Sequence, residues 1–329
     1  MNIMDENQKF ENLARKVKIK RWLWTIGLIV ILVPLVMIGF DKITGHLVRQ
    51  QSNQLFKKMD MRSTIMAPNI QTSDRLLADD NNQHGKIISH RYKEIDGYRI
   101  PWSSVEGRYD LFTNAIALSN VVDSHSQTQK SHKIKVLDYD RTTQTKIPLF
   151  YNNQYQAHLK ADSLVKPQEL PRVAQMSNYV AEVALTFKQP LTYQAIQQKL
   201  PQNLHANWYW IGTNKHNSLE VANNNYLGIQ AYNNRISNHD YQDFRKLLAQ
   251  AQTLGLTETF TLNNDQPYKP AQYAAYYAKK YPDLKKARFY GVIVTGQSEN
   301  FKQLENADWI SASSTGATIE RVPYIKPEY

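Results

Sequence analysis

The sequence predicts an α+β protein, with one N-terminal transmembrane helix followed by a mixed α/β region built on a central sheet. Two observations carry this prediction. Residues 22–40 form an uncharged run of 19 residues, and from residue 179 onward strand-like stretches alternate with stretches of helical periodicity. A chain of 329 residues is also long enough for two domains with an ordinary hydrophobic core.

The uncharged run WLWTIGLIVILVPLVMIGF is predicted to span a membrane. At about 1.5 Å per residue it reaches about 28 Å, close to the hydrocarbon thickness of a bilayer. Trp22 and Trp24 stand where aromatic anchors belong, Pro34 should kink the helix without ending it, and Phe40 closes the run. A cleaved signal peptide has a shorter apolar core and a small-residue cleavage site, and neither is found here.

Basic residues predict the orientation of this span. Residues 1–21 carry six Lys and Arg residues, while residues 41–55 carry only Lys42 and Arg49. The positive-inside rule then places the N-terminus in the cytoplasm and residues 41–329 outside the cell membrane. The formal charge of +11 divides into +3 for residues 1–21 and +8 for the exterior part. That exterior charge suits anionic wall polymers or lipid headgroups as partners better than nucleic acid, and the simpler interpretation is a general solvated basic surface.

Along the exterior part, residues 43–60 are predicted to continue the helix as a stalk, and residues 61–70 to form a strand that ends at Pro68. Asp96-Gly97 predicts a hairpin, residues 120–132 a loop, and residues 134–151 a second hairpin with an edge arm at Pro148. Beyond this point, strands are expected at 179–187, 204–211, 227–231, 287–295, 309–313 and 318–322. Helices are expected at 192–200, 240–254, 270–281 and 298–306.

The strand–helix–strand pattern occurs at 179–211 and again at 287–313, as a weak internal duplication or as ordinary alternation. The resulting division is a basic tail (1–21), the transmembrane helix (22–40), a stalk with a membrane-proximal module (41–162), a linker (163–178) and a C-terminal α+β module (179–329). The two prolines Pro167 and Pro171 mark the linker.

No catalytic or metal site is predicted. The chain has no cysteine, which excludes thiol nucleophiles, thiolate metal sites and disulfides, and it has no phosphate-binding loop, nucleophile elbow or His-Glu-x-x-His motif. Asp138 and Asp140 flank Tyr139, but the favoured interpretation is two solvated acids at a turn. In LHANWYWI, Trp208 and Trp210 share one face of a strand, and core packing is favoured over stacking on sugars. We therefore expect a non-enzymatic protein without cofactors or metals.

The short N-terminal tail is the predicted partner-binding element. Phe10, Leu13 and Val17 lie on one face of a predicted helix, and the basic residues Arg15, Lys16 and Lys18 oppose them. Such a face fits docking to a cytoplasmic or membrane partner, and it equally fits a basic amphipathic segment on anionic lipid.

Three short stretches resemble the membrane-anchored sigma-factor regulators, the anti-sigma factors, of Gram-positive bacteria. The first stretch, 63–70, contains Pro68 and Asn69; the second, 97–102, contains Pro101 and Trp102. The third covers the start of the C-terminal module and contains Phe187, Pro190, Pro201, Trp208 and Trp210. The resemblance extends over about residues 15–105, as an N-terminal regulator module, and over about residues 165–329, as a C-terminal regulator module.

The resemblance implies transcription regulation through an extracytoplasmic-function sigma factor, in response to the state of the cell envelope. The tail of 21 residues is shorter than the usual cytoplasmic sigma-binding domain. It must then bind the sigma factor as a single helix, or act through a second membrane regulator subunit. A membrane-anchored module that binds or processes cell-wall polymers is the main alternative, and a purely structural membrane subunit is a third.

Overall fold

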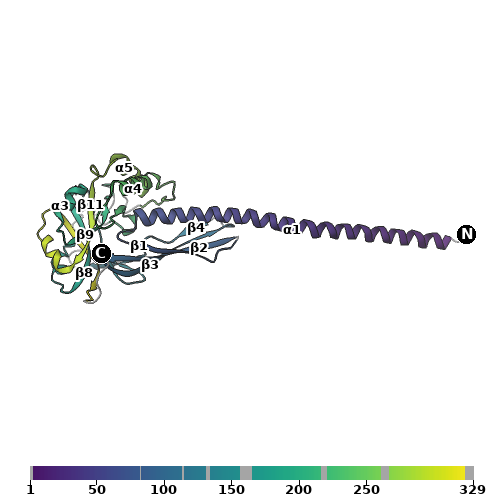
Figure 1. Cartoon of the computed structure of the whole chain (residues 1–329), viewed down its shortest axis with the longest axis horizontal. Helices are drawn as coiled ribbons and strands as arrows, with labels where there is room; N and C mark the ends of the chain where they lie inside the picture. The colour runs from purple at the N-terminus through teal and green to yellow at the C-terminus, as the bar shows by residue number, and fades with distance from the viewer. Residues whose placement is uncertain are drawn as a thin grey trace.

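The computed structural model describes residues 3–81, 83–112, 115–130, 134–155, 165–215, 221–260 and 267–322. Its longest element is helix α1 (Ile3–Ile65), which runs without a break through Pro34 and projects far from a folded head (Figure 1). The predicted stalk helix at 43–60 is thus confirmed. Within the described residues, α1 is the one helix long and apolar enough to cross a membrane, and its most apolar window is not buried by the rest of the chain.

The predicted strand at 61–70 is wrong, because α1 continues to Ile65 and the chain then turns. This segment has apolar residues at Met61, Ile65 and Met66, a spacing that serves a helix as well as a strand. All three side chains are buried, so the end of α1 is a core element of the head rather than a connector.

A four-stranded antiparallel sheet lies beside the last part of α1 (Figure 1). Its strands are β1 (Gln71–Ala78), β2 (His84–Ile95), β3 (Tyr98–Asp110) and β4 (Ala115–Leu118), in that order. The predicted Asp96-Gly97 hairpin joins β2 to β3, and both turn residues have the positive φ values, 51° and 82°, that such a turn requires. Leu55 of α1 packs against this sheet, close enough to Gly107 to leave no room there for a Cβ.

A second, three-stranded sheet contains β5 (Ser124–Lys130), β6 (Ile134–Asp140) and β7 (Lys146–Ile147). The hairpin predicted around residues 140–145 is present as β6 and β7, with β7 at the sheet edge before Pro148. The loop predicted over 120–132 is wrong for residues 124–130, because SHSQTQK forms β5, whereas residues 120–123 lie outside any strand. Because this segment contains no apolar residue, it lacks the alternation of apolar and polar residues that predicts a strand.

The C-terminal body is a five-stranded antiparallel sheet in the order β10-β9-β11-β8-β12. These strands are β8 (Tyr179–Leu191), β9 (Leu204–Trp210), β10 (Gly228–Gln230), β11 (Phe289–Gln297) and β12 (Ile310–Glu320). β12 replaces the two short strands predicted at 309–313 and 318–322; it stays one strand because an irregularity between Thr315 and Thr318 absorbs the residues around Gly316.

Helices connect these strands. They are α2 (Leu170–Ala174), α3 (Tyr193–Lys199), α4 (Asn238–Gln250) and α5 (Pro270–Lys280), with 3-10 turns η1 (Asn223–Asn225) and η2 (Ser298–Leu304). The two predicted strand–helix–strand units, β8-α3-β9 and β11-η2-β12, interlock: β11 lies between β8 and β9, and β8 lies between β11 and β12. This is the split β-α-β arrangement, used twice.

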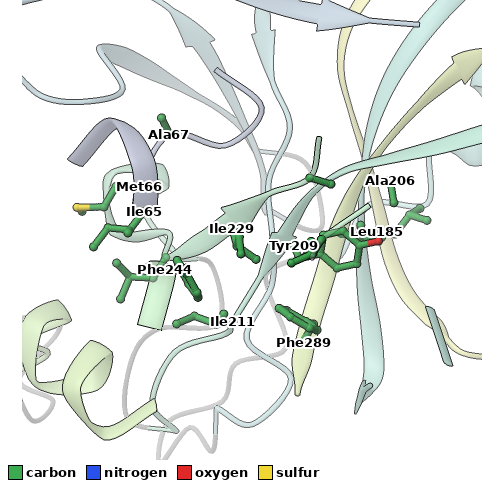
Figure 2. Close-up of a cluster of buried hydrophobic side chains, with 14 of the residues drawn as sticks. Ile65, Met66, Ala67, Leu185, Ala206, Tyr209, Ile211, Ile229, Phe244 and Phe289 are labelled. Atoms are coloured by element: carbon green, nitrogen blue, oxygen red, sulfur yellow. The ribbon is translucent and has the colours of Figure 1, made fainter. Parts of the chain in front are cut away.

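The two faces of this sheet have separate cores. On the helix-covered face, Tyr209 and Leu185 pack with Phe244 of α4, and the end of α1 enters the same cluster through Ile65 and Met66 (Figure 2). On the opposite face, Trp208 and Trp210 pack with Phe150 and Tyr226. The alternation of LHANWYWI therefore places its residues as predicted, with both tryptophans buried in the core.

Candidate functional site

The tail of α1 presents an apolar stripe that no described residue covers. Phe10, Leu13 and Val17 are 74%, 60% and 49% exposed and lie at helical spacing on one face. The stripe lies on the N-terminal side of the apolar run, so it is a separate surface from the membrane-length segment.

The expected anchor residues lie on the same continuous helix. Trp22, Trp24 and Phe40 are exposed on α1, as lipid-facing side chains would be, and Pro34 is inside the helix. The residues from Asp41 to Ile65 extend about 37 Å beyond the run at about 1.5 Å per residue. One helix thus connects the tail stripe, the apolar run and the core of the head.

A buried ion pair joins the sheet beside α1 to the C-terminal body. Nζ of Lys93 on β2 lies 2.9 and 2.7 Å from the two carboxylate oxygens of Glu182 on β8, and the side chains are 1% and 0% exposed. Burial lowers the pKa of Lys93, while the charge and hydrogen bonds of Glu182 oppose this shift. Two buried charges persist in such a place only when paired and hydrogen-bonded.

Two asparagines complete this pair, and we call Lys93, Glu182, Asn69 and Asn207 the polar junction. Nδ2 of Asn69 donates to Glu182 (2.9 Å) and to the carbonyl of Glu94 (3.3 Å). Nδ2 of Asn207 on β9 donates in turn to Oδ1 of Asn69 (3.2 Å). Asn69 has a φ of 51°, a conformation that asparagine tolerates better than most residues. It follows Pro68 directly after the end of α1, so the helix end is tied to the ion pair.

The second family-like stretch covers this junction. The ammonium of Lys93 lies 4.3 Å from the ring centroid of Trp102 on β3, a cation–π contact. Trp102 is buried, whereas Pro101 beside it is exposed. Asn69 and Trp102, which are 33 positions apart in the chain, therefore contact the same buried pair.

The remaining motif residues lie elsewhere. Phe187 is buried at the end of β8 against Trp309, while Pro190 and Pro201 are half-buried at the ends of β8 and α3. Trp208 and Trp210 belong to the core behind the sheet. The structure thus brings together Asn69 and Trp102, and does not bring these five residues to the same site.

Arg91, next to Lys93 on the buried face of β2, extends the polar region toward the three-stranded sheet. Its Nε donates to the carbonyl of Ser103 (2.7 Å), and Ser103 Oγ donates to Asp140 (2.5 Å). Burial lowers the pKa of Arg91 to about 10, against the opposing charges of Asp140 and Asp123. Every second residue of β2 points inward, which places Arg91 and Lys93 side by side in the interior.

The interpretation of Asp138 and Asp140 as solvated acids is wrong. Both are buried. Oδ1 of Asp140 accepts the backbone N–H groups of Thr142 (3.1 Å) and Thr143 (2.8 Å), while Asp138 accepts from Asn223 (2.7 Å). Burial raises the pKa of Asp138. These carboxylates therefore hold a turn and a neighbouring segment, and among the described residues no group of three or more His, Asp or Glu side chains is placed to share a metal ion.

Lys93, Glu182 and Asn207 were not among the functional residues predicted from the sequence. The two charged residues left a signal, because they stand at inward positions of strands: Glu182 interrupts the apolar string YVAEVALTF, and Lys93 alternates with Arg91 on β2. The sequence contains no such signal for Asn207. Inward charges in two different strands indicate a pair, but only the fold shows which strand faces which.

The comparisons with known proteins divide the chain at this junction. Residues 11–100 match the family model "Sigma factor regulator N-terminal", and residues 173–317 match "Sigma factor regulator C-terminal". No curated protein and no solved structure matches the chain. Asn69 and Lys93 fall in the first matched range and Glu182 and Asn207 in the second, so the polar junction is one of the contacts between the two matched modules, beside the apolar contacts of Ile65 and Met66.

Proposed function

Because the chain belongs to the sigma factor regulator family and is a regulator of a sigma factor, we propose that it is a single-pass membrane protein that controls an extracytoplasmic-function sigma factor in response to the state of the cell envelope. The tail lies in the cytoplasm and the head outside the cell. The excess of basic residues before the apolar run supports this orientation.

The observation that carries this proposal is the continuity of α1. One 63-residue helix holds the exposed tail stripe at one end and buried core residues at the other. A helix of this kind transmits a rotation or tilt of the head to the tail, since it has no flexible joint between them. The core contacts of Ile65 and the attachment of Asn69 to the polar junction fix the head end.

The tail acts as a docking helix in this proposal. Phe10, Leu13 and Val17 occupy one face, the pattern with which an amphipathic helix fills a groove in a partner. The partner is the sigma factor itself or a second membrane regulator subunit that binds the sigma factor. A single amphipathic helix can make this contact without a folded cytoplasmic domain.

A pull-down of the full chain from detergent-solubilised membranes tests the proposal. The variant Phe10→Ser/Leu13→Ser/Val17→Ser removes the stripe, and Gln8→Ser/Asn12→Ser changes the opposite side of the same helix as a control. We expect a sigma factor, directly or with a small membrane partner, to co-purify with the wild type and the control, and to be lost from the stripe variant. Recovery of neither partner with the wild type contradicts the proposal.

The orientation has its own test, which uses the absence of natural cysteine. Single cysteines at Asn12 and at Gln54 should react differently with a membrane-impermeant maleimide added to intact cells. We expect labelling at Gln54 alone; labelling at Asn12 alone reverses the proposed topology.

A further inference from the structure

The head contains a cavity whose lining combines lysines and tyrosines. It has a volume of about 460 Å³, within the range of small-molecule sites. The cavity lies between α5, the start of β11 and the segment after β9. Its twelve lining residues include three lysines, four tyrosines and no acid: Gln154, Thr213, Asn214, Lys215, Pro267, Lys269, Gln272, Tyr273, Tyr276, Lys280, Tyr281 and Tyr290.

The aromatic wall of the cavity is held in place. The hydroxyl of Tyr273 donates to the carbonyl of Ile211 (2.8 Å), and Nε2 of Gln154 donates to the hydroxyl of Tyr290 (3.2 Å). The ring of Tyr290 lies over Gly212, where any Cβ would come within 2.4 Å of it and where φ is +82°. The backbone there is thus shaped for the tyrosine ring, and the wall exists before any ligand arrives.

The positive charge of the cavity is positioned as well. Nζ of Lys280 donates to the hydroxyl of Tyr276 (2.8 Å) and lies 5.2 and 5.4 Å from the ring centroids of Tyr276 and Tyr281. The hydrogen bond to Tyr276 raises the pKa of Lys280 against the opposing effect of burial, so the ammonium is charged at neutral pH. Lys215 and Lys269 are exposed, and no carboxylate of the described residues forms an ion pair with either.

We propose that this cavity binds a phosphorylated polyol or sugar, such as one unit of an anionic phosphodiester polymer. The lysines neutralise phosphate, the tyrosine rings cover the C–H faces of the polyol or sugar, and the amide and hydroxyl groups reach its hydroxyls. The three lysines repel cationic ligands, because the lining contains no acid that would offset their charge. The cavity is open to solvent, but its volume of about 460 Å³ suits a single monomer unit better than the several nucleotides that a single-stranded nucleic acid site holds.

Binding to the purified full chain in detergent micelles tests this directly by titration calorimetry. The probe is a soluble oligomer of glycerol phosphate, compared with an uncharged polyol of equal length, an oligodeoxythymidylate and vesicles that contain phosphatidylglycerol. We expect the glycerol phosphate oligomer to bind at low salt and weaken as salt rises. Binding of vesicles alone, sensitive to the variants below, retains phosphate recognition and assigns it to a lipid headgroup.

The variants locate the binding. Lys269→Gln/Lys280→Gln should weaken the oligomer's affinity about tenfold or more, because two charge-assisted contacts to phosphate are lost. Lys285→Gln/Lys302→Gln makes the same change in charge outside the cavity and should leave the affinity within about twofold. Tyr276→Ala should weaken binding without a change in charge.

Several outcomes overturn the proposal: equal affinity in both lysine double variants, equal binding of the uncharged polyol, tighter binding of the oligodeoxythymidylate, or no binding of any phosphate-bearing probe at low salt. This assay contains no sigma factor. A negative result in this assay therefore does not contradict the proposed function, and a negative pull-down does not contradict ligand binding in the cavity.

Discussion

The core of the C-terminal body and the polar junction hold the head together in opposite ways. The core packs Leu185, Tyr209 and Phe244 between a sheet and its helices, with no charged partner to match. The junction joins the two family modules through Lys93 and Glu182. Both charges lose their hydration on burial, and their mutual attraction and hydrogen bonds compensate for this loss only in one geometry. An apolar contact tolerates small displacements, whereas a buried ion pair is either made or broken. The ion pair is therefore made in one position of β2 relative to β8 and broken in others, whereas the apolar packing of the end of α1 tolerates small shifts.

The largest expected effect comes from removing one partner of the ion pair. Glu182→Leu leaves the ammonium of Lys93 buried without its carboxylate and should lower the free energy of unfolding by about 3–5 kcal/mol. The double variant Lys93→Met/Glu182→Leu should recover most of this loss, because apolar side chains of similar size replace the pair. Thermal unfolding of the full chain in detergent, followed by near-ultraviolet circular dichroism, measures both.

A Glu182→Leu variant that is no less stable than the double variant would show that the pair is not buried as described. The comparison would also sharpen the regulatory role. If the double variant is stable but its capture of the sigma factor no longer changes when the envelope is stressed, then the two charges are needed for regulation rather than for folding.

Asn69 is expected to give the second largest effect. Asn69→Ala removes the amide that donates to Glu182 and places alanine at a positive φ. The free energy of unfolding should therefore fall by about 1–3 kcal/mol. Asn69→Gly also removes the amide but is relaxed at this φ. The difference between the two variants in the same unfolding measurement isolates backbone strain, and equal losses would assign the whole effect to the hydrogen bonds.

The smallest expected effect concerns Glu169, which attaches the three-stranded sheet to β12. Its carboxylate lies 2.5 Å from Lys146 and 3.1 Å from Lys135, and it accepts the N–H of Thr315 (2.8 Å). Burial alone would raise the pKa of Glu169, but the charge and hydrogen bond of Lys146, together with the hydrogen bonds of Thr315 and Lys135, hold the pKa below its usual value.

A lowered carboxyl pKa stabilises the fold above the unfolded value of about 4.3, and the gain disappears as pH falls through the folded value. At neutral pH, Glu169→Gln should therefore be less stable than the wild type by about 1–2 kcal/mol, with the difference shrinking below about pH 4. Unfolding curves at a series of pH values measure this gap. A gap that widens as pH falls contradicts the assignment of Lys146 and Lys135 as partners.

The same contrast explains what the sequence could predict. Strong periodic signals placed the apolar helix, the Asp96-Gly97 hairpin and the alternation of Trp208 and Tyr209, because each depends on residues close in the chain. The polar strand β5 gave no apolar alternation, and the end of α1 allowed two periods. The polar junction depends on Lys93 meeting a residue 89 positions away, and local patterns contain no information on that pairing.

The family-like stretches identified only some of the residues at the polar junction. Asn69 and Trp102 were singled out as motif residues, and both contact the buried pair. Pro190 and Pro201 were singled out on the same grounds and lie at element ends, where prolines terminate regular structure. A short motif therefore identified positions of interest without distinguishing a network member from a helix or strand boundary.

The central claim is that one rigid helix connects the tail to the head, and a single distance tests it most directly. Spin labels at Asn12→Cys and Gln54→Cys, in a chain with no other cysteine, lie on α1 on either side of the apolar run. At about 1.5 Å per residue, a continuous helix predicts a narrow distribution near about 60 Å in a reconstituted bilayer. A broad distribution centred well below that distance would show that the tail folds back or moves independently, and would contradict transmission through α1.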